Sequence, residues 1–214
     1  SHELKTPLTS ISGYAELITS GLAKPEDVPR FAQKIHSEAA RMIALVNDIL
    51  ALSRLDDMQQ LPQQMPVFEE LDLALIAKQT AERLRMNARN AYVVLHTATD
   101  SAPVRGDAQM LAELCQNLCD NAIRYNRPGG SVKIRLYSDD MRPVLSVADT
   151  GIGIGEEDKA RVFERFYRVD KSHSKETGGT GLGLSIVKHG VMLHSAEIKL
   201  QSKLGEGTTV SVIF

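Results

Sequence analysis

Two stretches near the start of the chain alternate hydrophobic and polar positions with the period of an α-helix. In the first stretch, the apolar positions spaced three or four residues apart are Leu4, Leu8, Ile11, Ala15, Ile18 and Leu22. The second stretch repeats this spacing over 31–53, and the segment between them, 21–29, contains one glycine and two prolines, which favour a turn. The pattern therefore predicts an antiparallel helical hairpin over residues 1–58. A hairpin with such an apolar seam usually pairs with a second copy in a four-helix bundle, so we expect a homodimer.

A polar segment with two prolines, 59–66 (QQLPQQMP), separates the hairpin from a region with a different pattern. In that region, helical periodicity predicts helices over 72–87, 107–125 and 180–193. Strand periodicity predicts strands over 92–96, 131–138, 143–149, 196–202 and 209–214. Helices and strands that alternate without strict βαβ order favour an α/β sandwich, in which helices cover one face of one mixed sheet. The whole chain is therefore predicted to be α+β, with a hairpin domain at 1–58, a linker at 59–66 and a second domain at 67–214.

The composition is that of a globular protein, because 43% of the 214 residues are hydrophobic and can form a core. Lys and Arg number 25 against 27 Asp and Glu, and the net charge of −2 provides no basic surface for nucleic acid or anionic lipid. We therefore expect no nucleic-acid partner and no membrane contact by this part of the protein. Its apolar runs are too short to cross a bilayer. The two cysteines, Cys115 and Cys119, are four residues apart in a helical pattern, which favours packing in a reducing compartment over a disulfide.

His2 stands on the first predicted helix, on the side opposite the apolar stripe. Thr6 and Thr9 share its outward face and Glu3 flanks it, so a histidine buried in the core fits this position poorly. A solvated surface histidine and a histidine that takes part in chemistry both remain open. Pro7 lacks an N–H, leaves the carbonyl of Glu3 without its helical donor, and should bend the helix beside His2.

Polar side chains follow one face of the helix predicted over 107–125. Asn117 and Asn121 are four residues apart, and Arg124 follows one turn later. The opposite face is apolar and carries Leu111, Leu114, Leu118 and Ala122. The polar face should line a cavity, where two amide oxygens can hold Mg²⁺ weakly and leave its other positions to phosphate oxygens and water. The alternative is a pair of asparagines that face solvent.

Two glycine-rich segments flank the long irregular stretch predicted over 152–178. In the segment DTGIGI, Asp149 ends a strand, and Gly151 and Gly153 allow a tight turn over a ligand. A buried carboxylate at a strand end can accept a hydrogen bond from the exocyclic amine of adenine. In GGTGLGLS, 178–185, the glycines that can present backbone N–H groups to phosphates at a helix N-terminus are Gly179, Gly181 and Gly183. This segment is neither a Walker A loop, because no Gly-Lys-Ser/Thr follows, nor the dinucleotide fingerprint.

These segments stand in the order found in sensor histidine kinases. HELKTPL resembles the H box of that family, NLCDNAIRY its N box and DTGIGI its G1 box. FERFYRVD at 163–170 resembles its F box, GGTGLGL its G2 box and GEGTTV at 205–210 its G3 element. The resemblance covers nearly the whole chain. It implies a dimerisation and phosphotransfer hairpin followed by an ATP-binding domain of the superfamily that includes histidine kinases, gyrases and chaperone ATPases.

The resemblance implies a site for ATP and Mg²⁺ in the second domain. Asp149 would hold adenine, and the two asparagines of the N box would hold the metal ion. The other positions that the resemblance assigns to ATP are Arg124, Tyr125, Gly151, Gly153, Arg168, Gly179, Thr180, Gly181, Leu182, Gly183 and Thr208. It further implies that 155–178 is a lid over the nucleotide, with Phe163 and Phe166 as hydrophobic anchors. A loop of this length in a compact domain is typical of a working lid.

The resemblance also implies a reaction. The γ-phosphoryl group of ATP would pass in line to a ring nitrogen of His2, and Glu3 would bond the other nitrogen and take up its proton. The phosphoryl group would then pass to an aspartate in the receiver domain of a response regulator. Thr6, one helical turn after His2, would place the water that hydrolyses the regulator's aspartyl phosphate, and an ordinary surface threonine is the alternative. Because the first helix begins without an N-cap, we expect a fragment of a longer protein. The resemblance implies that this fragment is cytoplasmic and that the full protein is anchored in the inner or cell membrane.

Two other classes of protein share parts of this pattern. ATP hydrolases of the same fold carry a glutamate that activates water at the position of Asn117, and an amide cannot act as that base. A scaffold without kinase activity would be expected to have lost motif positions, whereas every motif position is intact here. The labelled product formed from ATP distinguishes the three classes.

Overall fold

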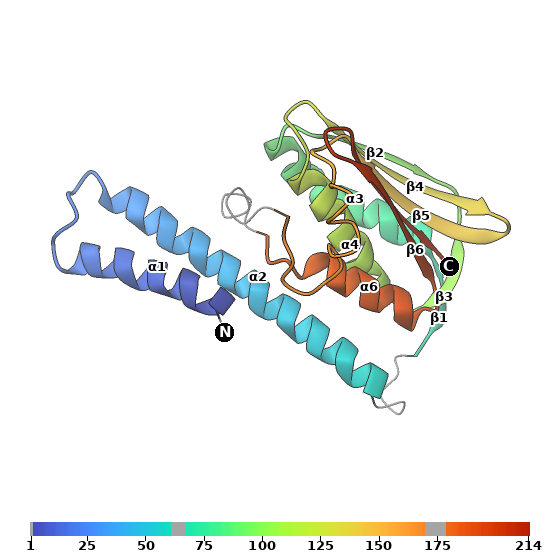
Figure 1. Ribbon diagram of the computed structural model, residues 1–214, viewed down its shortest axis with the longest axis horizontal. Coiled ribbons are helices and arrows are strands. Elements are labelled where there is room, and N and C mark those ends of the chain that lie inside the picture. The colour runs from blue at the N-terminus through green and yellow to red at the C-terminus, as the bar shows by residue number, and fades with distance from the viewer. Residues whose placement is uncertain (1, 61–66, 170–178) are drawn as a thin grey trace.

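The first part of the chain forms the predicted hairpin in the computed structural model. The structure describes residues 2–60, 67–169 and 179–214. It describes side chains throughout these ranges except at 2–3 and 55–60. Helices α1 (His2–Thr19) and α2 (Val28–Gln60) run antiparallel (Figure 1). The rings of Tyr14 and Phe31 pack with centroids 5.2 Å apart and join the two helices near the turn. Helix α2 includes the first two residues of the predicted linker, and the rest of that linker, 61–66, lies outside the described residues.

The second part is an α/β sandwich built on a mixed sheet of five strands, in the order β2-β4-β5-β7-β6. The strands are β2 (Val94–Thr99), β4 (Ser131–Asp139), β5 (Arg142–Asp149), β6 (Glu197–Lys203) and β7 (Gly207–Ile213). Strands β2 and β4 are parallel, and the other neighbours are antiparallel. The helices on one face of this sheet (Figure 1) are α3 (Leu73–Asn90), α4 (Ala108–Arg124) and α6 (Gly183–Leu193). The predicted mixed sheet with helices on one face is confirmed.

The ends of the five predicted strands differ from the observed ends by up to three residues, and two differences from the prediction have an identifiable reason. Strand β2 begins two residues after the predicted start, because Tyr92 adopts φ 56° in the turn that follows α3. A two-stranded antiparallel sheet, formed by β1 (Glu69–Asp72) and β3 (Pro103–Gly106), is absent from the prediction. Both strands are only four residues long, too short for their alternation to be recognised in the sequence.

Two of the three helices of this domain begin directly after the aspartates at which the prediction starts them, and each aspartate caps its helix. The Asp72 carboxylate accepts a hydrogen bond from the N–H of Ala74 at 2.9 Å, and the Asp107 carboxylate accepts one from Met110 at 2.8 Å. Each bond satisfies a donor that the first turn of a helix leaves unpaired. Helix α6 instead begins three residues after the predicted start, because Gly181 has φ 75° and cannot continue a right-handed helix.

Helix α4 divides into a buried face and a polar face, as its sequence predicts. The side chains of the apolar face, Leu111, Leu114, Leu118 and Ala122, are buried against the sheet and the neighbouring helices. Each fully buried leucine contributes about 1.5–3 kcal/mol relative to an exposed one. Both cysteines are free and buried, which confirms that they pack in the core. Within the described ranges, no helix is long and apolar enough to span a membrane.

The hairpin and the α/β domain meet where α2 runs beside α6 (Figure 1). Buried side chains from α2, from α4 and from the start of α6 form one cluster: Leu45, Leu52, Met110, Leu182 and Ile186. We call it the interdomain cluster. Side chains that pack against it include that of Leu4, near the start of α1. The same contact therefore involves both helices of the hairpin and the first residues of α6.

Candidate active site

The polar face of α4 carries the two asparagines and the arginine that the sequence singles out. All three side chains are half-buried. The side-chain N–H of Asn117 donates to the carbonyl oxygen of Glu113 at 2.9 Å. This bond fixes the amide orientation and leaves Oδ1 of Asn117 as an acceptor toward the neighbouring loop. The arrangement suits a weak cation site, because hard cations such as Mg²⁺ prefer oxygen ligands.

The segment 179–183, which we call the glycine loop, lies directly on this polar face. A Cβ added at Gly183 would stand 2.8 Å from Oδ1 of Asn117, and one at Gly179 would stand 3.1 Å from a guanidinium nitrogen of Arg124. The Gly179 position is also close to the Tyr125 hydroxyl, at 3.2 Å. The fold thus brings the G2 segment, the asparagines and Arg124 together, although they are far apart in the sequence.

Two side chains of the glycine loop point away from the asparagine face. The hydroxyl of Thr180 donates to Oδ2 of Asp48 on α2 at 2.5 Å. Leu182 is fully buried in the interdomain cluster. The Thr180 side chain therefore faces the hairpin, and its hydroxyl also accepts a hydrogen bond from the backbone N–H of Leu182 at 3.3 Å.

Asp149, at the end of β5, occupies a second part of the site. Its Oδ1 accepts hydrogen bonds from the backbone N–H groups of Gly151 at 2.8 Å and Thr208 at 3.2 Å. Burial raises the pKa of the Asp149 carboxyl, although both hydrogen bonds act in the opposite direction. Among the described residues, no protein donor bonds Oδ2, so this oxygen can accept a hydrogen bond from a ligand.

The turn after Asp149 requires glycine because other backbone segments approach it closely. A Cβ at Gly151 would lie 2.2 Å from the carbonyl oxygen of Tyr125, and one at Gly153 would lie 2.1 Å from that of Lys203. Gly153 also has φ 69°, which other residues rarely adopt. Both glycines that the sequence assigns to the site therefore serve to let the chain turn beside the Asp149 carboxylate.

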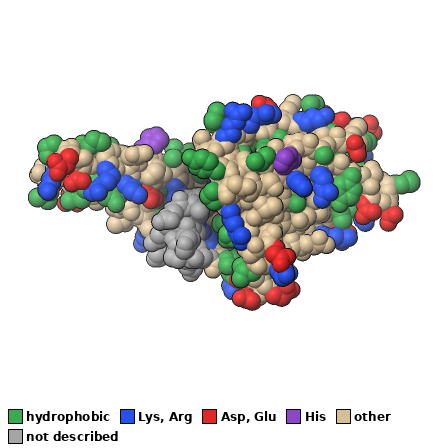
Figure 2. Space-filling view, turned by 90° about the horizontal axis from the view of Figure 1, so that it is seen from above, with side chains coloured by type: hydrophobic (Ala, Val, Ile, Leu, Met, Phe, Trp, Pro, Cys, Tyr) green, Lys and Arg blue, Asp and Glu red, His purple; other side chains and the backbone are tan. Residues whose placement is uncertain are grey.

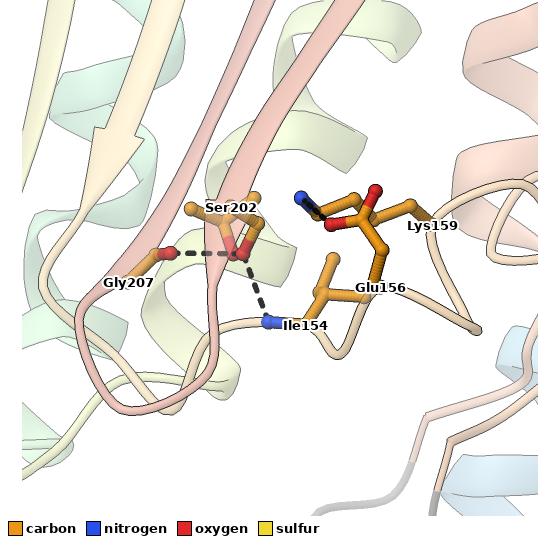
Figure 3. A network of polar contacts seen from close by, with 6 residues as sticks. Ile154, Glu156, Lys159, Ser202 and Gly207 are labelled. Carbon is orange, nitrogen blue, oxygen red and sulfur yellow. Dashed lines mark hydrogen bonds and ion pairs between the residues drawn. The ribbon is translucent and has the colours of Figure 1, made fainter.

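A small polar network fastens this turn to the β6–β7 hairpin (Figure 3). The Ser202 hydroxyl accepts from the N–H of Ile154 at 2.8 Å and donates to the carbonyl oxygen of Gly207 at 2.8 Å. It also lies 2.8 Å from the hydroxyl of Thr208. Beyond the turn, Lys159 and Glu156 form an ion pair at 2.6 Å. Ser202 is a positioning residue that the sequence did not reveal, because a serine in a strand carries no distinguishing pattern.

Acidic side chains gather near Arg124. Burial raises the pKa of Asp48, against hydrogen bonding by Thr180 and the charge of Arg124. Burial likewise raises the pKa of Asp120, whereas Arg124 lowers it. The positive charge of Arg124 is therefore partly offset by these carboxylates. Asp48 is the second residue that sequence reasoning missed, since its partner lies 132 positions away.

The described part of the predicted lid, 155–169, contains turns but no helix or strand. Phe163 is half-buried, as expected of an anchor, whereas the prediction for Phe166 is wrong: its side chain is 45% exposed and its φ is 63°. Phe166 contributes through its backbone N–H, which donates to the carbonyl oxygen of Gly181 at 2.9 Å. Arg168 is half-buried, with a guanidinium nitrogen 3.7 Å from a Cβ added at Gly179. The remaining lid residues, 170–178, lie outside the described residues.

The candidate phosphotransfer residues stand at the start of α1. His2 and Glu3 are in the first turn of the helix, and their side chains lie outside the described part of the chain. Thr6 is exposed one turn later. Leu4 packs against the interdomain cluster, which includes Leu182 of the glycine loop. The fold therefore brings the beginning of α1 to the side of the hairpin on which the nucleotide-binding candidates lie.

Comparison with known families accounts for this arrangement. Residues 1–57 match the His Kinase A (phospho-acceptor) domain. Residues 106–214 match the histidine kinase-, DNA gyrase B- and HSP90-like ATPases. The chain therefore belongs to the histidine kinase family and carries both domains of a histidine kinase catalytic core.

Individual relatives agree with this assignment. The sensor-like histidine kinase SenX3 of Mycolicibacterium smegmatis is 38% identical over 213 residues, which cover 99% of this chain and 54% of SenX3. The chain thus spans about half the length of that relative. The structure of the Acinetobacter baumannii histidine kinase AdeS is 25% identical with a TM-score of 0.77, over 100% of this chain and 97% of that one. Histidine kinase ThkA, in complex with response regulator protein TrrA, has the same fold, with a TM-score of 0.75 at 21% identity, over 100% of this chain and 58% of that one.

Proposed function

We propose that this chain uses ATP to phosphorylate His2 and then passes the phosphoryl group to an aspartate of a response regulator. The observation that carries the proposal is the position of the glycine loop. Its glycines lie on Asn117 and Arg124, while Leu182 shares the interdomain cluster with Leu4, two residues from His2. A phosphate held by this loop would be near the phosphotransfer end of the hairpin.

The ATP site proposed here has two parts that recognise different halves of the nucleotide. Asp149 would accept a hydrogen bond from adenine through Oδ2, because Gly151 and Thr208 already occupy Oδ1. The backbone N–H groups of the glycine loop, at the N-terminus of α6, suit the phosphates. Arg124, Tyr125 and Arg168 line the same loop.

We propose Asn117 and Asn121 as the protein ligands for Mg²⁺, which would neutralise phosphate charge when bound. The fit rests on Oδ1 of Asn117, which the bond from its Nδ2 to Glu113 leaves available. Two neutral amides bind the ion weakly, so the phosphates of ATP must complete the site. Asn117 also stands where a hydrolase needs a carboxylate base, which favours transfer to His2 over transfer to water.

In the transfer step, one ring nitrogen of His2 attacks the γ-phosphorus while the bond to the leaving ADP oxygen breaks. Glu3 would accept the proton from the other ring nitrogen, so that the attacking nitrogen keeps its lone pair. The chain's own contribution is to position the donor and the acceptor. Thr6, exposed one turn further along α1, is proposed to orient the water that hydrolyses the regulator's aspartyl phosphate.

The hairpin supports the proposal of a homodimer. A single chain leaves many of its hydrophobic side chains exposed, and hydrophobic side chains appear among charged ones on the face of the hairpin shown in Figure 2. These residues are Leu8, Leu17, Leu22, Ile43, Val46, Ile49 and Leu50. Pairing with a second hairpin would remove this apolar surface from water. ThkA, which has the same fold, was solved with a response regulator, which favours the same class of partner here.

We place the domain boundaries at 1–58 and 67–214, with a linker between them. Because the chain spans about half of SenX3, we propose that the full protein has further segments that anchor it to a membrane and sense a signal.

One incubation with γ-labelled ATP distinguishes the proposal from its two rivals. A histidine kinase produces label on the protein that is stable in base and labile in acid. An ATP hydrolase releases free labelled phosphate, and a scaffold without catalytic activity produces neither. Free phosphate without protein-bound label would show that the proposed function is wrong.

A further inference from the structure

The glycine loop is held from outside its own domain. The Thr180 hydroxyl donates to Asp48 on α2 at 2.5 Å, and Leu182 is fully buried in the interdomain cluster. On its other side the loop lies against Asn117 and Arg124. One short segment thus has one polar and one apolar contact with the hairpin, and it also covers the proposed phosphate site.

The Asp48 carboxylate also belongs to the charge environment of that phosphate site. Arg124 interacts with Asp48 and with Asp120, and Glu113 adds a further negative charge near Asp48. A triphosphate brings negative charge to the same region. A charged Asp48 would therefore oppose the entry of ATP in two ways, by repelling the phosphates and by offsetting the charge of Arg124.

We propose that Asp48 is a positioning residue that restrains the glycine loop through Thr180 and thereby lowers the affinity of the resting kinase for ATP. Breaking this bond frees the loop to close on phosphates. Because the bond also joins the two domains, ATP binding and separation of the α/β domain from α2 favour each other. The inference rests on the proposed nucleotide site and does not depend on phosphoryl transfer to His2.

Calorimetric titration tests the inference, with ATP-Mg²⁺ and adenosine as ligands. All variants carry His2→Gln in addition, so that no phosphoryl transfer accompanies binding. Asp48→Ala, which removes the acceptor of the Thr180 hydroxyl, should bind ATP about three- to tenfold more tightly, the range expected for the net contribution of one hydrogen bond. Adenosine affinity should not change, because adenosine has no phosphates. Asn47→Ala, at the exposed neighbouring position, is the control and should bind both ligands like the parent.

Thr180→Ala distinguishes two roles of Thr180 in ATP binding: an indirect role through its bond to Asp48, and direct contact with phosphate. If Thr180 acts through Asp48, Thr180→Ala also tightens ATP binding, and it has no additional effect in the Asp48→Ala background. If Thr180→Ala weakens ATP binding in both backgrounds, Thr180 contacts phosphate directly and the inference is wrong. Equal or weaker ATP binding by Asp48→Ala would overturn the inference as well. Failure of the parent to phosphorylate His2 would refute the proposed function but would leave this binding comparison valid.

Discussion

The backbone N–H of Thr208 donates to Oδ1 of Asp149 at 3.2 Å, and so joins the start of β7 to the end of β5 across 59 positions of sequence. Gly151 donates to the same oxygen from the following turn. The carboxylate is therefore held in one orientation, with Oδ2 left for a ligand. Burial makes this a costly position for a negative charge, as the raised pKa of Asp149 indicates.

Replacing Asp149 by asparagine should stabilise the nucleotide-free protein at neutral pH. Because burial raises the pKa of Asp149 in the folded state, folding favours the protonated form, and stability falls as pH rises from the unfolded pKa through the folded one. Asparagine keeps an oxygen for both N–H donors but carries no charge. Denaturant unfolding from about pH 4 to pH 8 should show the advantage of the variant growing with pH, whereas an advantage that shrinks with pH would contradict the argument.

The two halves of the nucleotide site should respond differently to mutation. Asp149→Asn should reduce the preference for ATP over GTP, because the amide that replaces Oδ2 can donate to guanine. Asn121→Ala should lower the affinity for ATP much more than the affinity for adenosine, because Asn121 acts on the metal and the phosphates. Titration calorimetry with the three ligands measures both effects, with the exposed Asp139→Asn as a control. If both variants bound all ligands like the parent, the assignment of the pocket would be wrong.

Gly183→Ala should abolish or strongly reduce ATP binding. A Cβ at this position would lie 2.8 Å from Oδ1 of Asn117, whose amide is fixed by its bond to Glu113. The added methyl group therefore displaces either the loop or the metal ligand. Gly13→Ala, on α1 and outside the nucleotide site, is the control, because a Cβ at Gly13 would have no described neighbour within 4 Å. Unchanged ATP affinity in Gly183→Ala would show that the loop and Asn117 do not act together.

Most of the architecture could be predicted because it rests on periodic patterns and local caps. The hairpin, the apolar face of α4 and the cap at Asp107 each follow from neighbouring residues. The motifs also identify the asparagine and glycine segments, but not the contact between them. The contact between Asp48 and Thr180 could not be predicted, because it depends on how two domains pack. The sequence also could not predict that Phe166 is exposed, because the exposure of this side chain depends on the lid conformation and not on its hydrophobicity.

Thr6→Ala should retain phosphorylation of the kinase and transfer to the regulator, but lose dephosphorylation of the regulator. The hydroxyl can both donate and accept, as alignment of a water requires. Alanine is the better helix former, so α1 should tolerate the change. The measurement is the decay of purified phosphorylated regulator mixed with each kinase variant and ADP. Equal decay with parent and variant would leave Thr6 an ordinary surface threonine.

Phosphorylation of His2 is tested most directly by labelling two histidine variants with γ-labelled ATP. His2→Gln should bind ATP within about twofold of the parent, as expected for a residue outside the nucleotide pocket, yet carry no acid-labile label. His36→Gln, which changes an exposed histidine on α2, is the control and should be labelled like the parent. Acid-labile label on His2→Gln at the parental level would contradict phosphoryl transfer to His2.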